Sequence, residues 1–470
     1  GLNNEAGTAT FQFARTGGDL SQPVTIRYTV GGSALENSFS ASPSLSGTVT
    51  IAAGQAVSDL ITITPQGGAA SPNQTVTVAV AEDPAYIVGS QDNATVTILG
   101  TPLTTTGATG PVVRYSSNGQ TVLSNHNTIQ DAINAAQANQ NEIIFVQEGT
   151  YNESVIINKS GLIIRGPNAG NNPNGGASVT PAIVQPPNAQ VAFTFDPNQT
   201  INNVTIEGLT IRTNNENGIR MQATTGGENI LIRRNVFTGP GEGDSGTIYM
   251  DLNPTSSVVS VRENVLRDIT NNISSGIQII DARTVTVLDN VLSNIVGPGM
   301  ALDNLTGTGT QISRISNNSV SNIGEQGIQL AGGNADITNN NVTNANRGPD
   351  GIPNTGDEDP EAGGIRLRNS GVAAVAPGTV NVLSNVITNS LNGVVIRPGT
   401  TVPSTVQVQF NNLIGNTAAG LRHSGTGALN AENNWWSDPA GPVVGGTGPR
   451  AITGASAGLV DFDPFSPTPF

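Results

Sequence analysis

Two residue markers recur with one irregular period from residue 200 onward, and this repetition limits the fold more than any other feature of the chain. The first marker is a glycine followed by alternating apolar residues, and the second is an asparagine within an apolar-x-x-Asn-x-apolar element. The glycines are Gly218, Gly246, Gly276, Gly299, Gly327, Gly364, Gly393 and Gly420. The asparagines are Asn235, Asn264, Asn290, Asn318, Asn340, Asn385, Asn411 and Asn434. Most repeats are 22 to 30 residues long, and both markers keep the same order along the chain.

A period of this length, with short strands and no helix, is typical of one coil of a parallel β-helix, and the missing leucine pattern excludes leucine-rich repeats. Each coil would advance the stack by about 4.8 Å, the usual spacing of strands. We expect asparagine to adopt the left-handed backbone bend between strands and its side-chain amides to form a ladder from coil to coil. The inward Ile, Val and Leu side chains would form aliphatic columns. The sequence therefore predicts an all-β chain with a right-handed parallel β-helix over residues 112–470.

Before the solenoid lies one segment with a helical pattern, residues 128–138. Thr128 and Asp131 form a start like a capping box, and Ile129, Ala132 and Ile133 lie on one face at helical spacing. A single amphipathic helix in this place is expected to cover the open apolar end of the first coil.

The two ends of the solenoid carry motifs that resemble known β-helix proteins. Thr128–Ile133, Ile143–Ile157 and Leu162–Gly166 look like the opening of pectin-lyase-like β-helices. Asn433–Pro442 and Val460–Phe465 are similar to the terminal coil and cap of bacterial surface β-helix proteins. These resemblances imply the fold and no particular chemistry. We assign 437–470 to a C-terminal cap and expect the preceding Trp435 and Trp436 to form a hydrophobic plug.

Residues 1–100 differ from the rest and predict a β-sandwich, because short alternating strands are separated by glycine, proline and asparagine turns. Four segments of this module resemble the Calx-β family. They are Ala9–Leu20, Val24–Gly32, Leu45–Gln55 and Ala94–Ile98. Family members often bind calcium through clustered acids, but the corresponding stretches 66–73 and 99–102 contain no carboxylates. Residues 101–111 form a polar linker.

Composition excludes several classes of function. The formal net charge is −15, and the 19 basic residues include one lysine, Lys159, without any basic run. Nucleic acid is therefore a poor partner. The chain has no cysteine, which excludes disulfides and thiolate metal sites. No apolar run reaches the roughly 18 residues of a membrane span. We expect a secreted or cell-surface protein of bacterial type.

The outward-facing residues can be compared with the catalytic residues of pectin-lyase-like β-helices. The chain lacks the aspartate pair and histidine motif of polygalacturonases and the strand motif of pectin methylesterases. Pectate-lyase-like β-elimination places carboxylates on stacked coils around calcium, with an arginine or lysine as base. Alignment on the glycine marker puts Asp251, Asp281 and Asp303 near the ends of one strand in successive coils, with Arg368 and Arg397 further on. The competing interpretation is that these aspartates only form the turns at the ends of the strands. A lone His423 is expected to be a surface residue.

The largest interruption of the period, residues 346–361, is an acidic insertion. Its Asp350-Gly-Ile-Pro-Asn354 resembles the calcium repeats of thrombospondin-like modules. The candidate calcium ligands are Asp350, Asn354, Asp357, Asp359 and Glu361. A solvated acidic loop is the alternative. A second insertion, Pro167–Gly176, predicts a flexible loop.

These observations lead to two hypotheses about function. The first is a non-catalytic extracellular or cell-surface structural protein, such as an adhesin, surface-layer component or filament subunit, with self-assembly or glycan binding as its partners. The second is a secreted calcium-dependent polysaccharide lyase or epimerase that acts on an acidic glycan through Asp251, Asp281, Asp303 and Arg368. The sequence favours the first, because no catalytic set is complete and an acidic surface opposes a polyanionic substrate.

Overall fold

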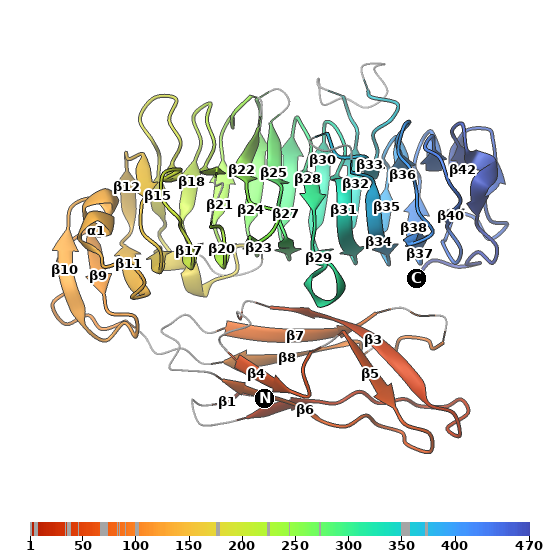
Figure 1. The fold of residues 1–470 in the computed structure, drawn as a ribbon, viewed down its shortest axis with the longest axis horizontal. Coiled ribbons are helices and arrows are strands. Elements are labelled where there is room, and N and C mark those ends of the chain that lie inside the picture. The colour runs from red at the N-terminus through yellow and green to blue at the C-terminus, as the bar shows by residue number, and fades with distance from the viewer. Residues whose placement is uncertain are drawn as a thin grey trace. The chain divides into compact units, whose positions relative to one another are not determined.

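The chain folds into two compact units (Figure 1), described here from a computed structural model. The structure describes residues 2–470 except positions 4–7, 33, 35–38, 46, 66–73, 82, 84, 90, 99–102, 175–178, 223–225, 244, 272–273, 349–357 and 372–374. Unit 1 comprises Gly1–Ala108 and Tyr115–Leu123, and unit 2 comprises Thr109–Arg114 and Ser124–Phe470.

Unit 1 is built from two sheets around a shared apolar core. The larger sheet has the order β1 (Leu2–Asn3), β8 (Asn93–Ile98), β7 (Gln74–Val80), β3 (Val24–Gly31) and β5 (Thr48–Ile51). The smaller has the order β2 (Ala9–Phe11), β6 (Ile61–Pro65) and β4 (Phe39–Ser42). Ile51, Ile61 and Ile63 are at most 1% exposed between them. Alternation of apolar and polar residues along these strands gives the two-sheet sandwich expected from the sequence.

Unit 2 is a right-handed parallel β-helix with three long parallel sheets, as predicted. Sheet 1 contains β11 (Glu142–Val146), β14 (Leu162–Arg165), β17 (Val204–Glu207), β20 (Ile230–Arg233), β23 (Val258–Arg262), β26 (Thr284–Leu288), β29 (Ser313–Ser316), part of β31 (Ile328–Thr338), β34 (Pro377–Leu383), β37 (Val406–Gln409), β40 (Leu429–Asn430) and β43 (Val460–Asp461). Sheet 2 contains β12 (Gly149–Tyr151), β15 (Ala182–Val184), β18 (Thr210–Arg212), β21 (Val236–Thr238), β24 (Val265–Ile269), β27 (Val291–Ile295), β30 (Ser319–Ile323), β32 (Asn341–Ala345), β35 (Val386–Thr388) and β38 (Asn412–Ile414). Sheet 3 contains β13 (Val155–Ile157), β16 (Phe193–Phe195), β19 (Ile219–Gln222), β22 (Gly246–Asp251), β25 (Ser275–Ile280), β28 (Met300–Leu305), the start of β31, β33 (Ile365–Arg368), β36 (Asn392–Ile396), β39 (Ala419–His423) and β42 (Gly448–Thr453). Two further strands, β9 (Val112–Tyr115) and β10 (Val122–His126), lie next to β11.

The interior of the solenoid consists of aliphatic columns that run from coil to coil. In sheet 3 the strand register places one apolar residue of each coil directly beside the next. This column contains Ile219, Ile248, Ile277, Met300, Ile328, Ile365, Val394 and Leu421, all 0% exposed. Since side chains alternate along a strand, the residues on either side of each column member point outward.

The repeated glycines are required by close packing of the coils. A Cβ atom on Gly276 would lie 2.8 Å from the carbonyl oxygen of Gly299, and one on Gly299 would lie 2.5 Å from that of Gly327. The same approach, 2.7 Å, occurs between Gly327 and Gly364. A side chain here would collide with the backbone of the following coil, so the marker reports coil stacking.

The repeated asparagines form a continuous buried ladder. In each step the side-chain oxygen of one asparagine accepts hydrogen bonds from the backbone N–H and the amide of the asparagine before it, as in Asn290 to Asn318 (3.0 Å for both) and Asn318 to Asn340 (3.0 and 2.9 Å). The amide of Asn318 also donates to the carbonyl oxygen of Val287 at 2.9 Å. Each ladder asparagine is at most 1% exposed. The predicted ladder is confirmed.

The predicted backbone bend is one residue away from the asparagine. The positive φ angles belong to the residue immediately before each ladder asparagine. These residues are Arg234, Glu263, Asp289, Asn317, Asn339, Ser384, Phe410 and Asn433, with φ between 53° and 59°. The expectation that asparagine itself adopts the left-handed conformation was wrong, because its function in the turn is to hydrogen-bond and not to bend.

The N-terminal end of the solenoid is covered by α1 (Ile129–Ala135), slightly shorter than predicted (Figure 1). The Thr128 hydroxyl accepts a hydrogen bond from the Asp131 N–H at 3.0 Å. Glu153 accepts from the first helical N–H groups, those of Ile129 and Gln130. The single lysine of the chain, Lys159, donates to three carbonyl oxygens at the other end of the helix, between 2.6 and 3.0 Å. A carboxylate thus pairs with the free N–H groups at the start of the helix, and an ammonium group pairs with the free carbonyl oxygens at its end.

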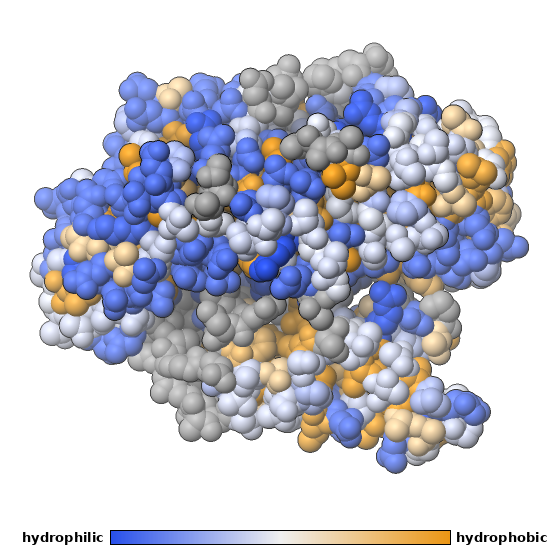
Figure 2. Space-filling view, viewed as in Figure 1, coloured by the Kyte–Doolittle hydropathy of each residue, from blue (hydrophilic) through white to orange (hydrophobic). Residues whose placement is uncertain are grey.

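Beyond Trp436 the solenoid continues, because β42 pairs with β39 and β43 pairs with β40. Trp436 is fully buried in the solenoid core, with Phe462 and Phe465 of the tail packed against that core. Apolar residues also remain on the surface near this end, where Val443 and Val444 are 49% and 51% exposed. Figure 2 shows hydrophobic residues gathered on the end of the solenoid that carries β42. Among the described residues, no helix is long and apolar enough to cross a membrane.

We expect Asn318→Ala to lower the free energy of unfolding by about 3 kcal/mol or more. The substitution removes the acceptor of the buried Asn290 backbone N–H and the side-chain donor to the Val287 carbonyl, and each buried group that loses its partner costs about 1 to 3 kcal/mol. Thermal and urea unfolding of the full chain measure the effect. Asn322→Gly is the control, because Asn322 has a φ of 56° and an exposed hydrogen bond to Asn294. Equal losses in the two variants would contradict the prediction.

Candidate functional site

The outer face of sheet 3 carries the residues that the sequence singled out for chemistry. Strand register aligns Asp251 with Ile280, Ile280 with Asp303, Asp303 with Ala331 and Ala331 with Arg368. Asp251, Asp303 and Arg368 therefore belong to one outward column, in every second strand. Neighbouring strands are about 4.8 Å apart, so successive members of this set are separated by roughly 10 Å at the backbone.

The third aspartate, Asp281, lies one position beyond this column. It has a φ of 55° and is the residue after β25. Its carboxylate accepts a hydrogen bond from the Asn304 amide at 2.6 Å. Its charge also raises the pKa values of Asp251 and Asp303, so the three carboxylates lie close enough to influence one another. The structure brings the predicted aspartates together, with an offset of one residue.

Asp251 and Asp303 both have pKa values above the ordinary value, but their environments differ. Burial is the largest cause for Asp251, followed by the negative charge of Asp281. Burial also raises the pKa of Asp303, whereas the Ser370 hydroxyl, the charge of Arg368 and the Gly371 N–H oppose the rise. Both carboxyl groups therefore hold a proton more tightly than an ordinary aspartate, and Asp303 differs in having a cationic partner, Arg368.

Arg368 reaches back along the column to Asp303. Its Nη2 lies 3.6 Å from the Asp303 Oδ2, over the small side chain of Ala331 in the strand between them. The pKa of Arg368 is lowered by burial and by the neighbouring positive charge of Arg397, and raised by Asp303. A carboxylate and a guanidinium therefore meet at the boundary between acidic coils and arginine-containing coils.

Tyr249 joins this site and was missed from the sequence. It points outward from β22 two residues before Asp251, and Arg220 of the preceding coil lies beside it in register. Burial and the charge of Asp251 raise the pKa of Tyr249, and a hydrogen bond with Gln222 lowers it. The alternation of side chains along a strand could have identified Tyr249, since Tyr249 and Asp251 occupy the same face of one strand.

The predicted calcium ligands have different outcomes. Asp350, Asn354 and Asp357 lie outside the described residues. Asp359 pairs with Arg366 at 3.0 Å, and Glu361 pairs with Arg422 at 2.6 Å. Among the residues that the structure describes, no three or more His, Cys, Asp or Glu side chains form a group that could hold a metal ion. Asp251, Asp281 and Asp303 are among these residues. Their spacing along sheet 3 does not suit a shared calcium ion, whose ligands lie 2.3 to 2.6 Å away.

His423 does not lie on the surface as expected. It aligns with Ile396 in an inward column of sheet 3 and is 0% exposed. Its Nε2 hydrogen-bonds with the Gly427 carbonyl at 2.9 Å, and burial lowers the pKa of the imidazole. The surface prediction was wrong because one residue of register decides between the two faces of a strand.

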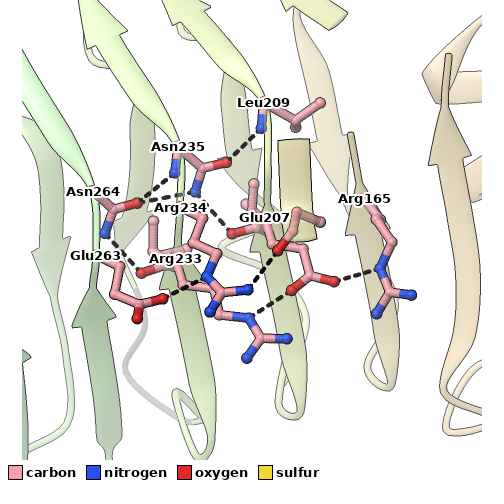
Figure 3. A network of polar contacts seen from close by, with 11 residues as sticks. Arg165, Glu207, Leu209, Arg233, Arg234, Asn235, Glu263 and Asn264 are labelled. Carbon is pink, nitrogen blue, oxygen red and sulfur yellow. Dashed lines mark hydrogen bonds and ion pairs between the residues drawn. The ribbon is translucent and has the colours of Figure 1, made fainter. Parts of the chain in front are cut away.

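A second polar cluster lies on sheet 1 and is buried (Figure 3). Glu207 lies between Arg165 and Arg233 of the adjacent strands, with ion-pair distances of 2.5 and 2.6 Å. Next to them Arg234 pairs with Glu263 at 2.5 Å. Glu207 is 0% exposed, and the two arginines lower its pKa to about 2 against the opposing effect of burial. The side chains of the cluster are buried, so these ion pairs join neighbouring strands of sheet 1 and are not exposed to solvent.

The insertion expected to be a flexible loop covers part of this cluster. Its first residues form the 3₁₀ turn η1 (Pro167–Gly170), and Arg234 donates to the Ala169 carbonyl at 2.8 Å. Asn174 extends the contact across sheet 1 to the Asp289 carbonyl, also at 2.8 Å. Residues 167–174 are therefore a structural cover, and 175–176 lie outside the described residues.

Comparison with known proteins agrees with the fold. A family model described as right handed beta helix region matches residues 193–361. A search of the curated proteins finds no match. Among solved structures, the chain is similar to the catalytic unit of a thermostable GH87 α-1,3-glucanase from Streptomyces thermodiastaticus strain HF3-3, with 14% identity, a TM-score of 0.44 and coverage of 97% of this chain and 87% of that one.

Two other solved structures are also similar. One is the A-module of the mannuronan C-5 epimerase AlgE4 of Azotobacter vinelandii, with 12% identity, a TM-score of 0.32 and coverage of 73% of this chain and 94% of that one. The other is the family 28 exopolygalacturonase of Yersinia enterocolitica, with 11% identity, a TM-score of 0.31 and coverage of 98% and 96%. The names of all three describe polysaccharide-active enzymes, which does not agree with the expectation of a non-catalytic structural or adhesive protein. At these identities and TM-scores the likeness is one of fold.

We expect Glu207→Gln to destabilise the solenoid by about 3 to 5 kcal/mol at neutral pH, because it leaves two buried guanidinium groups without their counter-charge. The folded-state pKa of about 2 lies below the ordinary 4.5, so the carboxylate's contribution is present above pH 4.5 and is lost as pH falls toward 2. Urea unfolding across this range should show a steeper loss in the native chain than in the variant.

The control is Glu216→Gln, which removes an exposed pair with Arg220 (3.4 Å) and should change stability by less than about 0.5 kcal/mol. Identical pH slopes for the native chain and the Glu207→Gln variant would contradict the structural role of this cluster.

Proposed function

We propose that unit 2 is a polysaccharide-active enzyme that binds an acidic glycan on the outer face of sheet 3 and acts on it by lyase or epimerase chemistry. The observation that carries the proposal is the junction of Asp303 and Arg368 in one outward column with Asp251. It places a guanidinium beside carboxyl groups whose pKa values are raised, on a surface where an extended chain can lie.

Both reactions begin by removing a proton from the carbon next to a sugar carboxylate, and this C–H group is a weak acid. A positive charge at the sugar carboxylate stabilises the electrons that move onto it when the C–H bond breaks. Arg220, which lies beside Tyr249 in register, supplies this charge at the sugar that reacts, and Arg368 and the exposed Arg397 hold carboxylates of sugars further along the glycan. Asp251, in its ionised form, is placed as the base that takes the proton.

The second half of the reaction needs an acid. In an elimination the electrons form a double bond, the bond to the leaving sugar oxygen breaks, and that oxygen takes a proton. In an epimerisation the proton returns to the same carbon from its opposite side. Tyr249 carries a protonated hydroxyl on the same strand face as Asp251 and is the donor in this proposal.

Arginine charges replace the calcium ion that the sequence suggested for these aspartates. The carboxylates of Asp251 and Asp303 belong to strands separated by an intervening one, which disfavours a shared ion. Asp303 instead holds the Arg368 guanidinium in place. Arg368 thus acts as a binding group for the substrate, oriented by Asp303.

We further propose that unit 1 is a Calx-β-like sandwich that accompanies the enzyme. Support comes from the four segments that resemble the family and from the two-sheet arrangement of β1 to β8.

The test is incubation with oligouronates and with a neutral α-1,3-glucan in deuterated water. We expect deuterium at the carbon next to the carboxylate of the uronate products, and in the lyase case an unsaturated product that absorbs ultraviolet light. Asp251→Asn should lower kcat by roughly 100-fold or more, as expected for loss of a general base. The acidic limb of the native pH profile should lie above pH 3.8, because the pKa of Asp251 is raised.

Asp268→Asn, on sheet 2, is the matched control and should retain full activity. Cleavage of the neutral glucan without exchange of deuterium, or full activity in Asp251→Asn, would refute the proposed chemistry.

A further inference from the structure

Three arginines continue the outer face of sheet 3 beyond the candidate site, and we name them the arginine row: Arg366, Arg397 and Arg422. Register places Arg366 beside Val395, and Val395 beside Arg422, in one outward column. Arg397 directly follows β36, which lies between the strands of Arg366 and Arg422. The row therefore follows the solenoid axis with one arginine in each of three successive strands of sheet 3.

The row concentrates positive charge in a chain whose net charge is −15. The charge of Arg397 contributes to lowering the pKa of both Arg366 and Arg368, which shows that like charges lie close together there. Arg366 has a pKa of about 10, lowered mainly by burial, and remains charged at neutral pH. Within the described part of the chain, the exposed Arg397 side chain has no hydrogen bond or ion pair.

Two members of the row are occupied by carboxylates from an acidic turn, residues 358–361. Asp359 Oδ2 lies 3.0 Å from Arg366 Nη1. Glu361 Oε1 accepts hydrogen bonds from Arg422 Nη2 at 2.6 Å and from its Nε at 2.9 Å. The turn thus presents carboxylates to guanidinium groups from above sheet 3, as the carboxylates of a bound polyuronate would.

Hydrogen bonds that do not involve these carboxylates also hold the turn on the solenoid. The buried amide of Asn346 donates to the Asp359 carbonyl at 2.7 Å. The amide of Asn392, which is 1% exposed, donates to the Pro360 and Ala362 carbonyls at 3.2 and 2.9 Å. Amides therefore also anchor the backbone of the turn. Each ion pair joins a more exposed side chain to a less exposed one: Asp359 is 42% exposed and Arg366 8%, and Arg422 is 29% exposed and Glu361 18%. Because one partner of each pair reaches solvent, another carboxylate can approach the pair and replace the one present.

We propose that the arginine row is a binding site for successive carboxylates of an acidic glycan, and that Asp359 and Glu361 are built-in competitors for it. The strand spacing of about 4.8 Å is close to the length of one sugar unit in an extended chain, so one glycan residue can lie over each coil. This inference rests on the proposed function for its ligand class. It adds a direction of binding along the axis and an intramolecular carboxylate that the ligand displaces.

The experiment measures binding of a defined oligouronate to the full chain by calorimetry, with a neutral oligosaccharide of equal length beside it. The double variant Asp359→Asn/Glu361→Gln should bind the oligouronate roughly three- to ten-fold more tightly, because two competing carboxylates are removed from Arg366 and Arg422. Arg397→Gln should bind it roughly five-fold or more weakly. Asp268→Asn, on sheet 2, removes one negative charge outside the arginine row and should bind as the native chain does.

Unchanged or weaker binding by the double variant overturns the inference. A second readout does not depend on variants: carbodiimide labelling of Glu361, followed by mass spectrometry, should become faster when the oligouronate is bound. Slower or unchanged labelling overturns the exchange of carboxylates. Equal binding of an oligophosphate would show a general polyanion site and would overturn selectivity for uronates.

These outcomes are separable from those of the proposed function. Tighter binding by the double variant without any turnover supports the arginine row and refutes the chemistry. Turnover with unchanged binding in the double variant supports the chemistry and refutes the competition.

Discussion

The buried asparagine ladder is the interaction on which the rest of the structure depends. Every coil must turn at the same place, and the turn leaves backbone groups that no water can reach. Asn264, Asn290 and their successors satisfy these groups with the amides and carbonyls of the adjacent coils. A ladder of this kind tolerates neither a shift of one residue nor a missing member, since a buried unpaired group is costly. It therefore fixes the register of the strands on either side of this turn, from Asn235 to Asn434.

Once the register is held, the outer face of sheet 3 becomes a surface on which distant residues meet. Asp303 and Arg368 come from strands β28 and β33 and pair across β31. The same stacking places Arg220 beside Tyr249 on an early coil and Arg366 and Arg422 on later ones, with Asp251 and Asp303 between them. The charges around Glu207 on sheet 1 are, by contrast, buried.

Parts of this arrangement could be predicted from the sequence because they repeat. Glycine and asparagine recur at positions where the coils touch, so their spacing reveals the solenoid and its period. The position of the bend was predicted one residue too late, since the residues that adopt it range from Arg234 to Phe410 and share no single residue type. His423 was placed on the wrong face although the Gly420 marker lies in its own strand, because its residue type was given more weight than the alternation that puts Leu421 and His423 on one face. The insertion 167–174 has loop-like composition, and only its contacts with Arg234 and Asp289 reveal its function as a cover.

The sequence by itself determined the coil, its period, its N-terminal helix and the candidate aspartates, because each of these depends on local spacing or on a repeated contact. The tertiary structure alone decided which outward side chains meet. Glu361 reaches Arg422 across 61 residues, and Tyr249 joins Asp251 and Arg220 at one site. Coils of unequal length still stack strand on strand at one spacing, so insertions change the distance along the chain without changing the distance in space. Spacing in the sequence cannot reveal such pairs for that reason, and only the stacked register brings them together.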